Sequence, residues 1–133
     1  MACDSFNNVV RSKHQTVAVV GASPKPKRYA NQAMRLLAQH GHHEIPINPA
    51  FDEIEGEKCC PSVGSVPEPI NAITMYLGKA RSDPLSAEII AKKPVRIIMN
   101  PGAENNDLAA KARKHGIEVV EGCTLMMLGS GTF

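Results

Sequence analysis

The stretch that decides the fold is TVAVVGASP, which occupies residues 16–24. Five β-branched or small residues lead into Gly21, and a segment with helical spacing of apolar residues begins near residue 29. A buried strand that turns through a glycine into a helix is a common phosphate-binding device, because the first amides of the helix donate hydrogen bonds and its dipole favours an anion. Lys25, Lys27 and Arg28 add three cations to this turn. The sequence therefore predicts a phosphorylated ligand here.

The bulk properties of the chain narrow its class. Its 133 residues suit one domain, and its formal net charge of +2 gives no reason to expect nucleic acid as a partner, which usually requires a dense basic face. Its apolar runs are far shorter than the roughly 20 residues of a membrane span, so no membrane contact is expected. No charged leader with an apolar segment opens the chain, which favours a cytoplasmic protein.

The cysteines and histidines do not indicate a metal site or a disulfide framework. No CxxC pair and no Cys/His pair at ligand spacing occurs, so we expect no bound metal and reduced thiols. Cys123 follows a predicted strand at the ligand face, but a nucleophile needs a neighbouring base or a lowered pKa, and we interpret this thiol as a small buried residue. The four cysteines are Cys3, Cys59, Cys60 and Cys123.

After a polar lead-in arm over residues 1–14, strand-like and helix-like segments alternate through a domain over 15–133. Nearly continuous aliphatic runs predict buried parallel strands at 16–20, 44–48, 71–77, 95–99 and 117–121. Helical spacing predicts helices at 29–40, 83–92 and 104–115. The segment 49–70, rich in proline and glycine, is expected to be a long loop with one short strand or helical turn.

Alternating strands and helices predict a three-layer α/β fold, Rossmann-like, with a parallel five-stranded sheet in the order 3-2-1-4-5. That order places a topological switch point between the first and fourth strands, and ligands bind beyond the carboxyl ends of the strands at such a point. The loops expected there are 21–28, 48–49, 76–79, 100–102 and 122–123.

Two other interpretations of the glycine turn stay open. The dinucleotide fingerprint GxGxxG is incomplete, because Ser23 and Pro26 replace its later glycines and Asn48-Pro49 stands where a ribose-binding acid is expected. An NAD(P)- or other nucleotide-binding protein is therefore an alternative interpretation, and the missing glycines and the missing acid count against it. The turn can also be an ordinary tight turn with solvated cations, in an interaction module whose phosphate loop is vestigial.

Several short motifs follow one another in a specific order: VVGASP at 19–24, IPINP at 45–49, GEKC at 56–59, PSV at 61–63 and VP at 66–67. In this order they resemble the small stand-alone CoA-binding proteins, whose domain is similar to the CoA-binding Rossmann domain of the succinyl-CoA synthetase alpha subunit. The resemblance runs from about residue 14 to the end of the chain. It implies that the ligand is coenzyme A or a CoA thioester.

The resemblance also implies which residues touch the ligand. The loop Ser23-Pro24-Lys25 would contact the phosphates and pantetheine, Asn48-Pro49 would border the adenine and ribose, and the strand ends at Tyr76 and Asn100 would line the cofactor. The chain departs from the family pattern at Ala50-Phe51, at Cys60, after Tyr76 and after Cys123. Together with the switch-point loops, the predicted ligand-binding residues are Gly21, Ala22, Ser23, Pro24, Lys25, Arg28, Asn48, Pro49, Tyr76, Leu77, Asn100 and Pro101.

We expect binding without catalysis. The synthetase reaction requires a phosphorylatable histidine and a nucleotide-grasping domain, which the resemblance places in additional domains of those enzymes. The histidines of this chain fall at predicted helix ends and loops, away from the predicted site, so no catalytic residue is assigned. The apolar group Met126-Met127-Leu128 is interpreted as core or as a subunit interface, which makes a homodimer or an unknown protein partner a further expectation.

Overall fold

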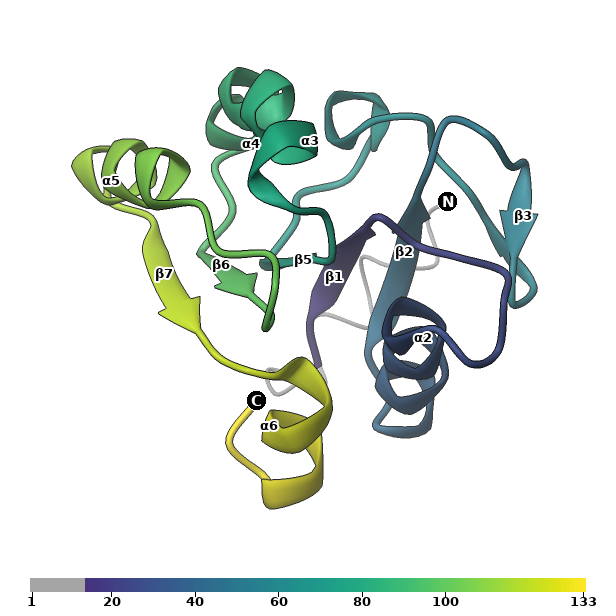
Figure 1. Ribbon diagram of the computed structural model, residues 1–133. Coiled ribbons are helices and arrows are strands. Elements are labelled where there is room, and N and C mark those ends of the chain that lie inside the picture. Colours follow the sequence, from purple (N-terminus) through teal and green to yellow (C-terminus); the bar gives the residue numbers. More distant parts are fainter. Residues whose placement is uncertain (1–13) are drawn as a thin grey trace.

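The computed structural model describes residues 14–133, so the predicted arm over 1–14, His14 apart, and Cys3 lie outside the described residues. Five parallel strands form one sheet with helices on both faces (Figure 1). The strands are β1 (Thr16–Val20), β2 (His43–Ile47), β5 (Ala72–Met75), β6 (Arg96–Met99) and β7 (Glu118–Glu121). The predicted three-layer α/β class and the five-stranded parallel sheet are confirmed.

Each face of the sheet packs against its own helices. One face carries α2 (Tyr29–Gln39) and α6 (Thr124–Ser130), and the other carries α3 (Lys79–Ser82), α4 (Ser86–Lys92) and α5 (Asn106–Lys114) (Figure 1). Along β1, Val17 and Val19 join the hydrophobic cluster under α2, whereas Ala18 and Val20 join the cluster on the opposite face. Burial on both faces explains why this strand has no polar alternation.

The strand order requires a correction. The sheet runs β2-β1-β5-β6-β7, so the strand near 71–77 lies between β1 and β6 and not beside β2, as the order 3-2-1-4-5 would have it. The switch point therefore lies between β1 and β5, the first and third strands of the sheet along the chain. The chain leaves β1 for α2 on one face and leaves β5 for α3 and α4 on the other.

The outer edge of β2 explains this order. The Cys60 N–H donates to the Pro46 carbonyl oxygen at 2.9 Å, and the Asn48 N–H donates to the Cys60 carbonyl oxygen at 3.0 Å. Pro46 itself has no N–H to offer a further strand. Because the loop that follows β2 already covers this edge, the next long strand pairs with the free side of β1.

The loop between β2 and β5 holds more structure than predicted. It contains two short antiparallel strands, β3 (Glu53–Ile54) and β4 (Glu57–Lys58), and the 3-10 turn η1 (Val63–Ser65). The helix predicted at 83–92 begins earlier, as α3 and the 3-10 turn η2 (Asp83–Leu85), before α4. Helix α6 was not predicted. Among residues 14–133, no helix is long and apolar enough to cross a membrane.

Candidate functional site

Gly21 joins the ends of β1 and β5. Its φ is +89°, and a Cβ added there would lie 2.9 Å from Cδ2 of Leu77 and 3.2 Å from the carbonyl carbon of Tyr76. On the other side, its N–H donates to the Ile47 carbonyl oxygen at 3.2 Å. A glycine is required both for the positive φ and for this close approach. The turn therefore lies at the switch point itself.

The loop after Gly21 is held in place by side chains that bond its carbonyl oxygens. Asn48 Nδ2 donates to the Ala22 carbonyl oxygen at 2.9 Å. Asn31 Nδ2 donates to the Ser23 carbonyl oxygen at 2.9 Å, and Arg35 donates to Pro26 at 2.8 Å. These carbonyl dipoles are bound to donors of the protein, so the loop keeps one path into α2.

The N-terminus of α2 is available to an anion. Its N-cap residue, Arg28, forms no side-chain capping bond, and no acidic residue lies in the first turn. Helix α5 differs, because the Asn105 side chain accepts a hydrogen bond from the Leu108 N–H and Asp107 lies in the first turn. In α2 the Asn31 N–H donates to the Arg28 carbonyl oxygen at 3.1 Å, which leaves the Tyr29 and Ala30 amides and the helix dipole without a side-chain acceptor.

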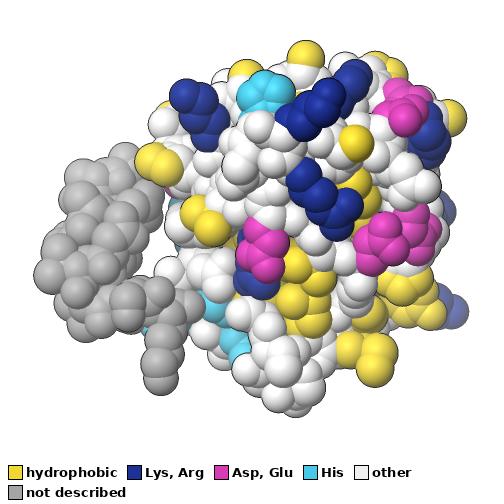
Figure 2. Space-filling view, turned by 90° about the vertical axis from the view of Figure 1, so that its left-hand side faces the viewer, with side chains coloured by type: hydrophobic (Ala, Val, Ile, Leu, Met, Phe, Trp, Pro, Cys, Tyr) yellow, Lys and Arg dark blue, Asp and Glu magenta, His cyan; other side chains and the backbone are white. Residues whose placement is uncertain are grey.

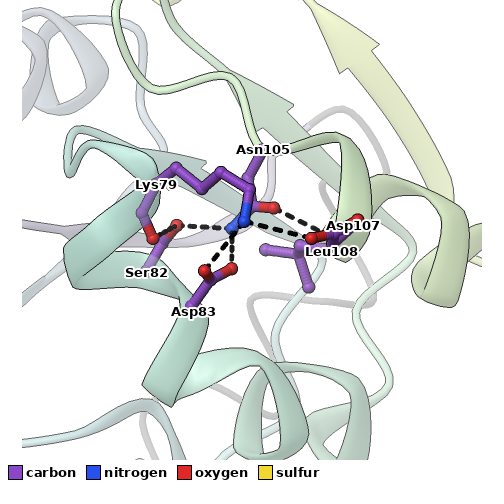
Figure 3. A network of polar contacts seen from close by, with 6 residues as sticks. All are labelled: Lys79, Ser82, Asp83, Asn105, Asp107 and Leu108. Carbon is purple, nitrogen blue, oxygen red and sulfur yellow. Dashed lines mark hydrogen bonds and ion pairs between the residues drawn. The ribbon is translucent and has the colours of Figure 1, made fainter.

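The cations of the site divide into two groups. Lys25, Lys27 and Arg28 are exposed, and none of them forms an ion pair within residues 14–133. Lys79 Nζ, at the end of the β5 loop, lies 2.9 Å from Asp83 Oδ2 and 3.0 Å from Asp107 Oδ2 (Figure 3). Hydrogen bonds to these two carboxylates raise the pKa of Lys79. The free positive charge therefore comes from the α2 loop.

The network around Lys79 fastens α3 to α5. Asn105 Nδ2 donates to Ser82 Oγ at 2.8 Å and to Asp83 Oδ1 at 2.9 Å, while its Oδ1 caps α5 (Figure 3). The hydrogen bond from Lys79 lowers the pKa of Asp83, with Asn105 adding to the effect. These groups are partners of one another, and we assign them a structural role.

A cavity of about 220 Å³ opens between the α2 loop and the ends of β5 and β6. It brings together part of the predicted set, namely Gly21, Ser23, Arg28, Tyr76 and Pro101. Sequence reasoning did not assign its other lining residues, Tyr29, Ala30, Gly102 and Ala103. Tyr29 begins α2 and is 70% exposed. The one signal in the sequence that could have found it is an aromatic residue directly after the basic turn.

The remaining predicted residues do not line the cavity. Ala22 is buried, Pro24 and Lys25 are exposed on the loop, Pro49 is exposed beyond β2, and Leu77 packs on Gly21. The other two are asparagines with internal partners. Asn48 bonds Ala22 as above, and its Oδ1 accepts from the Ala50 N–H at 2.8 Å. Direct contact of these residues with a ligand stays a prediction.

Asn100 ties three elements together behind the cavity. It is 2% exposed, and its Nδ2 donates to Thr74 Oγ1 at 2.7 Å and to the Met75 carbonyl oxygen at 2.8 Å. Its Oδ1 accepts from the Thr124 N–H at 2.8 Å. Asn100 thus links β5, β6 and the start of α6, which gives it a positioning role.

Tyr76 gives the cavity a neutral wall. Its hydroxyl is buried and has no hydrogen-bond partner within the described part of the chain. Burial, which outweighs the nearby hydroxyls of Thr124 and Thr74, raises the pKa of Tyr76 to about 12. The phenol therefore stays protonated at neutral pH and cannot act as a base there.

Other reactive groups lie outside the cavity lining. Cys123, half-buried, is the N-cap residue of α6, and Cys59 and Cys60 lie beside β2; all three are free thiols. Between His14 and Phe133, no group of three His, Cys, Asp or Glu side chains is placed to hold a metal ion. On the side of the molecule that carries α5 and β7, basic side chains alternate with acidic and apolar ones and form no single basic patch (Figure 2).

Known proteins resemble this chain in sequence and structure. Residues 15–129 match the family described as CoA binding domain. The chain is 28% identical over 118 residues to the ADP-forming acetate–CoA ligase I of Archaeoglobus fulgidus, a match that covers 86% of this chain and 17% of the ligase.

Two solved structures agree over almost their whole length. An uncharacterized protein of known crystal structure is 36% identical, with a TM-score of 0.85, and the match covers 90% of this chain and 98% of that one. A hypothetical protein from Pyrococcus horikoshii OT3 is 27% identical, with a TM-score of 0.84, over 99% of this chain and 92% of that one. The Rossmann-like fold is thus found in relatives of similar size.

Proposed function

This chain belongs to the CoA-binding domain family, and on that premise we propose that it binds coenzyme A or a CoA thioester at the cavity between Gly21, Arg28 and Tyr76. The observation that carries the proposal is the N-terminus of α2, which no side chain caps, beside three cations that form no ion pair within residues 14–133. Coenzyme A carries a pyrophosphate and a 3′-phosphate, which are anions that such a helix end and such cations favour.

The phosphates lie over the loop and the first turn of α2 in this arrangement. Arg28 and Lys25 offer charged donors, and the amides at the start of the helix add neutral ones. The cavity of about 220 Å³ is smaller than the roughly 300–1,000 Å³ of pockets that enclose a drug-sized ligand. Only part of the cofactor is enclosed, and the remainder follows the exposed surface.

Binding without chemistry is the second part of the proposal. The groups nearest the cavity are committed elsewhere or unreactive: the Tyr76 phenol is neutral, the Asn100 amide is fully bonded, and Lys79 is held by two carboxylates. Among the lining residues there is no pair of nucleophile and base. The match to 17% of an acetate–CoA ligase supports a ligand-binding role, such as regulation, carriage or delivery to a protein partner.

Thermal unfolding with a panel of ligands tests the proposal. A ligand present at a hundredfold excess over its Kd stabilises the native state by about 2.7 kcal/mol. We expect CoA and acetyl-CoA to raise the Tm and NAD, NADP and ATP to raise it less. A shift with NADP and none with CoA would overturn the proposal in favour of a dinucleotide. No shift with any of them would favour an interaction module.

A further inference from the structure

A second cavity, of about 570 Å³, lies at the outer edge of β2, away from the α2 loop. We call it the edge groove, and its charged and apolar lining includes Glu44, Ile45, Glu57, Pro61, Pro67 and Glu68. We propose that the edge groove binds a protonated aliphatic amine. This inference is independent of the proposed CoA site, because the two cavities share no lining residue.

The edge groove exists because the loop after β2 covers only part of the strand. Cys60 bonds the carboxyl half of β2 through the Pro46 carbonyl oxygen and the Asn48 N–H. The amino half, His43–Ile45, lines the groove instead, opposite β4 and the turn after it. The volume falls within the roughly 300–1,000 Å³ typical of small-molecule sites.

Glu44 is the group that points to a ligand. It is only 6% exposed, yet within residues 14–133 no other residue forms a hydrogen bond or ion pair with its carboxylate, whose one bond is to its own peptide N–H. Burial raises the pKa of Glu44 and the nearby Glu57 adds to the rise, while the hydrogen bond to its own N–H and the nearby His43 act in the opposite direction. A largely buried carboxylate without an ion-pair partner within residues 14–133 is unfavourable, and its oxygens are not among the fully enclosed polar atoms, so a cation that enters the groove can reach and compensate it.

The other charged groups of the groove leave it acidic. Glu57 is half-buried, and Glu68 Oε2 lies 3.5 Å from His43 Nδ1. Lys58 lines the groove but is exposed and is not among the charges that act on Glu44. The part of the chain that the structure describes holds no three-ligand group suited to a metal ion. An organic cation therefore fits this lining better than a coordinated metal ion does.

The walls of the groove specify what carries this cation. Ile45, Cys59, Pro61 and Pro67 supply apolar surface around the carboxylates. An ammonium group on an aliphatic chain satisfies both features, since its charge meets Glu44 and its methylenes cover the apolar wall. A free alkylamine and a lysine side chain of a protein share this chemistry, and the experiment below distinguishes them.

The test is an NMR titration of the full chain at pH 7.5 with n-pentylamine, with n-pentanol as the uncharged match. We expect millimolar concentrations of pentylamine to shift the amide signals of residues 43–45 and 57–61. Pentanol should bind at least about tenfold more weakly, because it cannot form the charged hydrogen bond. A blocked tripeptide with a central lysine forms the second arm. Tighter binding of the peptide assigns the site to a protein partner, and tighter binding of pentylamine assigns it to a free amine.

The matched variant is Glu44→Gln, which keeps the shape and removes the charge. It should weaken pentylamine binding about tenfold and leave the response to CoA unchanged, so a failure of this proposal is distinguishable from a failure of the CoA site. If Glu44→Gln does not fold, Glu57→Gln serves in its place. Equal binding of pentanol and pentylamine, undiminished binding in the folded variant, or no shift in the groove would overturn the proposal.

Discussion

Gly21 and Leu77 are packed so tightly, at the ends of adjacent parallel strands, that a Cβ on Gly21 would lie 2.9 Å from Cδ2 of Leu77. This contact joins the turn proposed to bind phosphate to the end of β5, where the two strands of the switch point lie side by side. This tight turn at the switch point brings Arg28 of the loop and Tyr76 at the end of β5 to one cavity.

Gly21→Ala should therefore lower both stability and ligand binding. The positive φ alone is unfavourable by about 1–2 kcal/mol for an L-residue, and the tight contact with the Tyr76 backbone adds to it. Urea denaturation measures the change. The matched control is Gly116→Ala, which has a φ of +78° but nothing within 4 Å of an added Cβ. Equal losses in the two variants would mean that the packing against β5 is unimportant.

Lys25→Ala and Arg28→Ala should weaken CoA binding with little change in stability. Each removes an exposed cation that has no ion pair in the described chain, so the free energy of unfolding should stay within about 0.5 kcal/mol. Loss of a charged hydrogen bond should raise the Kd about tenfold. Calorimetric titration gives the Kd, and Lys114→Ala, an exposed cation at the end of α5, is the control. Unchanged affinity in both loop variants would place the phosphates elsewhere.

Asn100→Ala should destabilise the protein, because we assign Asn100 a positioning role behind the cavity. The substitution removes three hydrogen bonds: the buried Thr124 N–H loses its acceptor, and Thr74 Oγ1 and the Met75 carbonyl oxygen each lose a donor. A buried group left unsatisfied costs about 1–3 kcal/mol. The loss should be at least about 2 kcal/mol in chemical denaturation, whereas Asn106→Ala, on the exposed side of α5, should have little effect. A stable Asn100→Ala protein with lost CoA binding would instead assign Asn100 to the ligand.

The stability of the protein should fall as the pH drops below about 6.5, in part because of His42. The His42 Nδ1 accepts a hydrogen bond from the Gln15 N–H at 3.0 Å, which requires the neutral ring. Burial, with the charges of His14, His40 and Arg96, lowers the pKa of His42. The unfolded chain therefore binds the proton more readily, so this contribution is present above the unfolded pKa and is lost as the pH falls through the folded one.

His42→Asn isolates that contribution, because the Asn side chain keeps an acceptor near the position of Nδ1. Urea denaturation of both proteins between pH 7.5 and 5.5 should show a smaller pH dependence in the variant. The raised pKa of Glu44 acts in the opposite direction, and its effect cancels in the difference between the two proteins. Identical pH profiles would show that His42 does not carry the effect.

The sequence predicts the bounds of single strands better than it predicts which strands lie side by side in the sheet. Continuous aliphatic runs identified the five sheet strands to within two residues at each end, because burial on both faces leaves a strong pattern. The strand order depended on Cys60 covering the edge of β2, a contact between segments that no local pattern reveals. The sequence did not predict helix α6, because its few apolar residues directly follow β7 and are bounded by glycines.

The site was partly predictable, because the residues at strand ends can be read from local patterns whereas the direction of their side chains cannot. The glycine turn and strand ends identified Gly21, Ser23, Arg28, Tyr76 and Pro101, which meet at one cavity because the carboxyl ends of parallel strands share an edge. Asn48 and Asn100 also end strands, but their side chains bond the backbone. The direction of an amide side chain depends on the packing around it, which the sequence does not display.

The most direct test of the central claim is the map of backbone amide shifts when CoA is added to the isotope-labelled protein. We expect the largest changes on residues 21–30 and on the ends of β5 and β6 near Tyr76 and Gly102, with the edge groove at residues 43–45 unaffected. Changes confined to other surfaces, or no change at a saturating concentration of CoA, would contradict it.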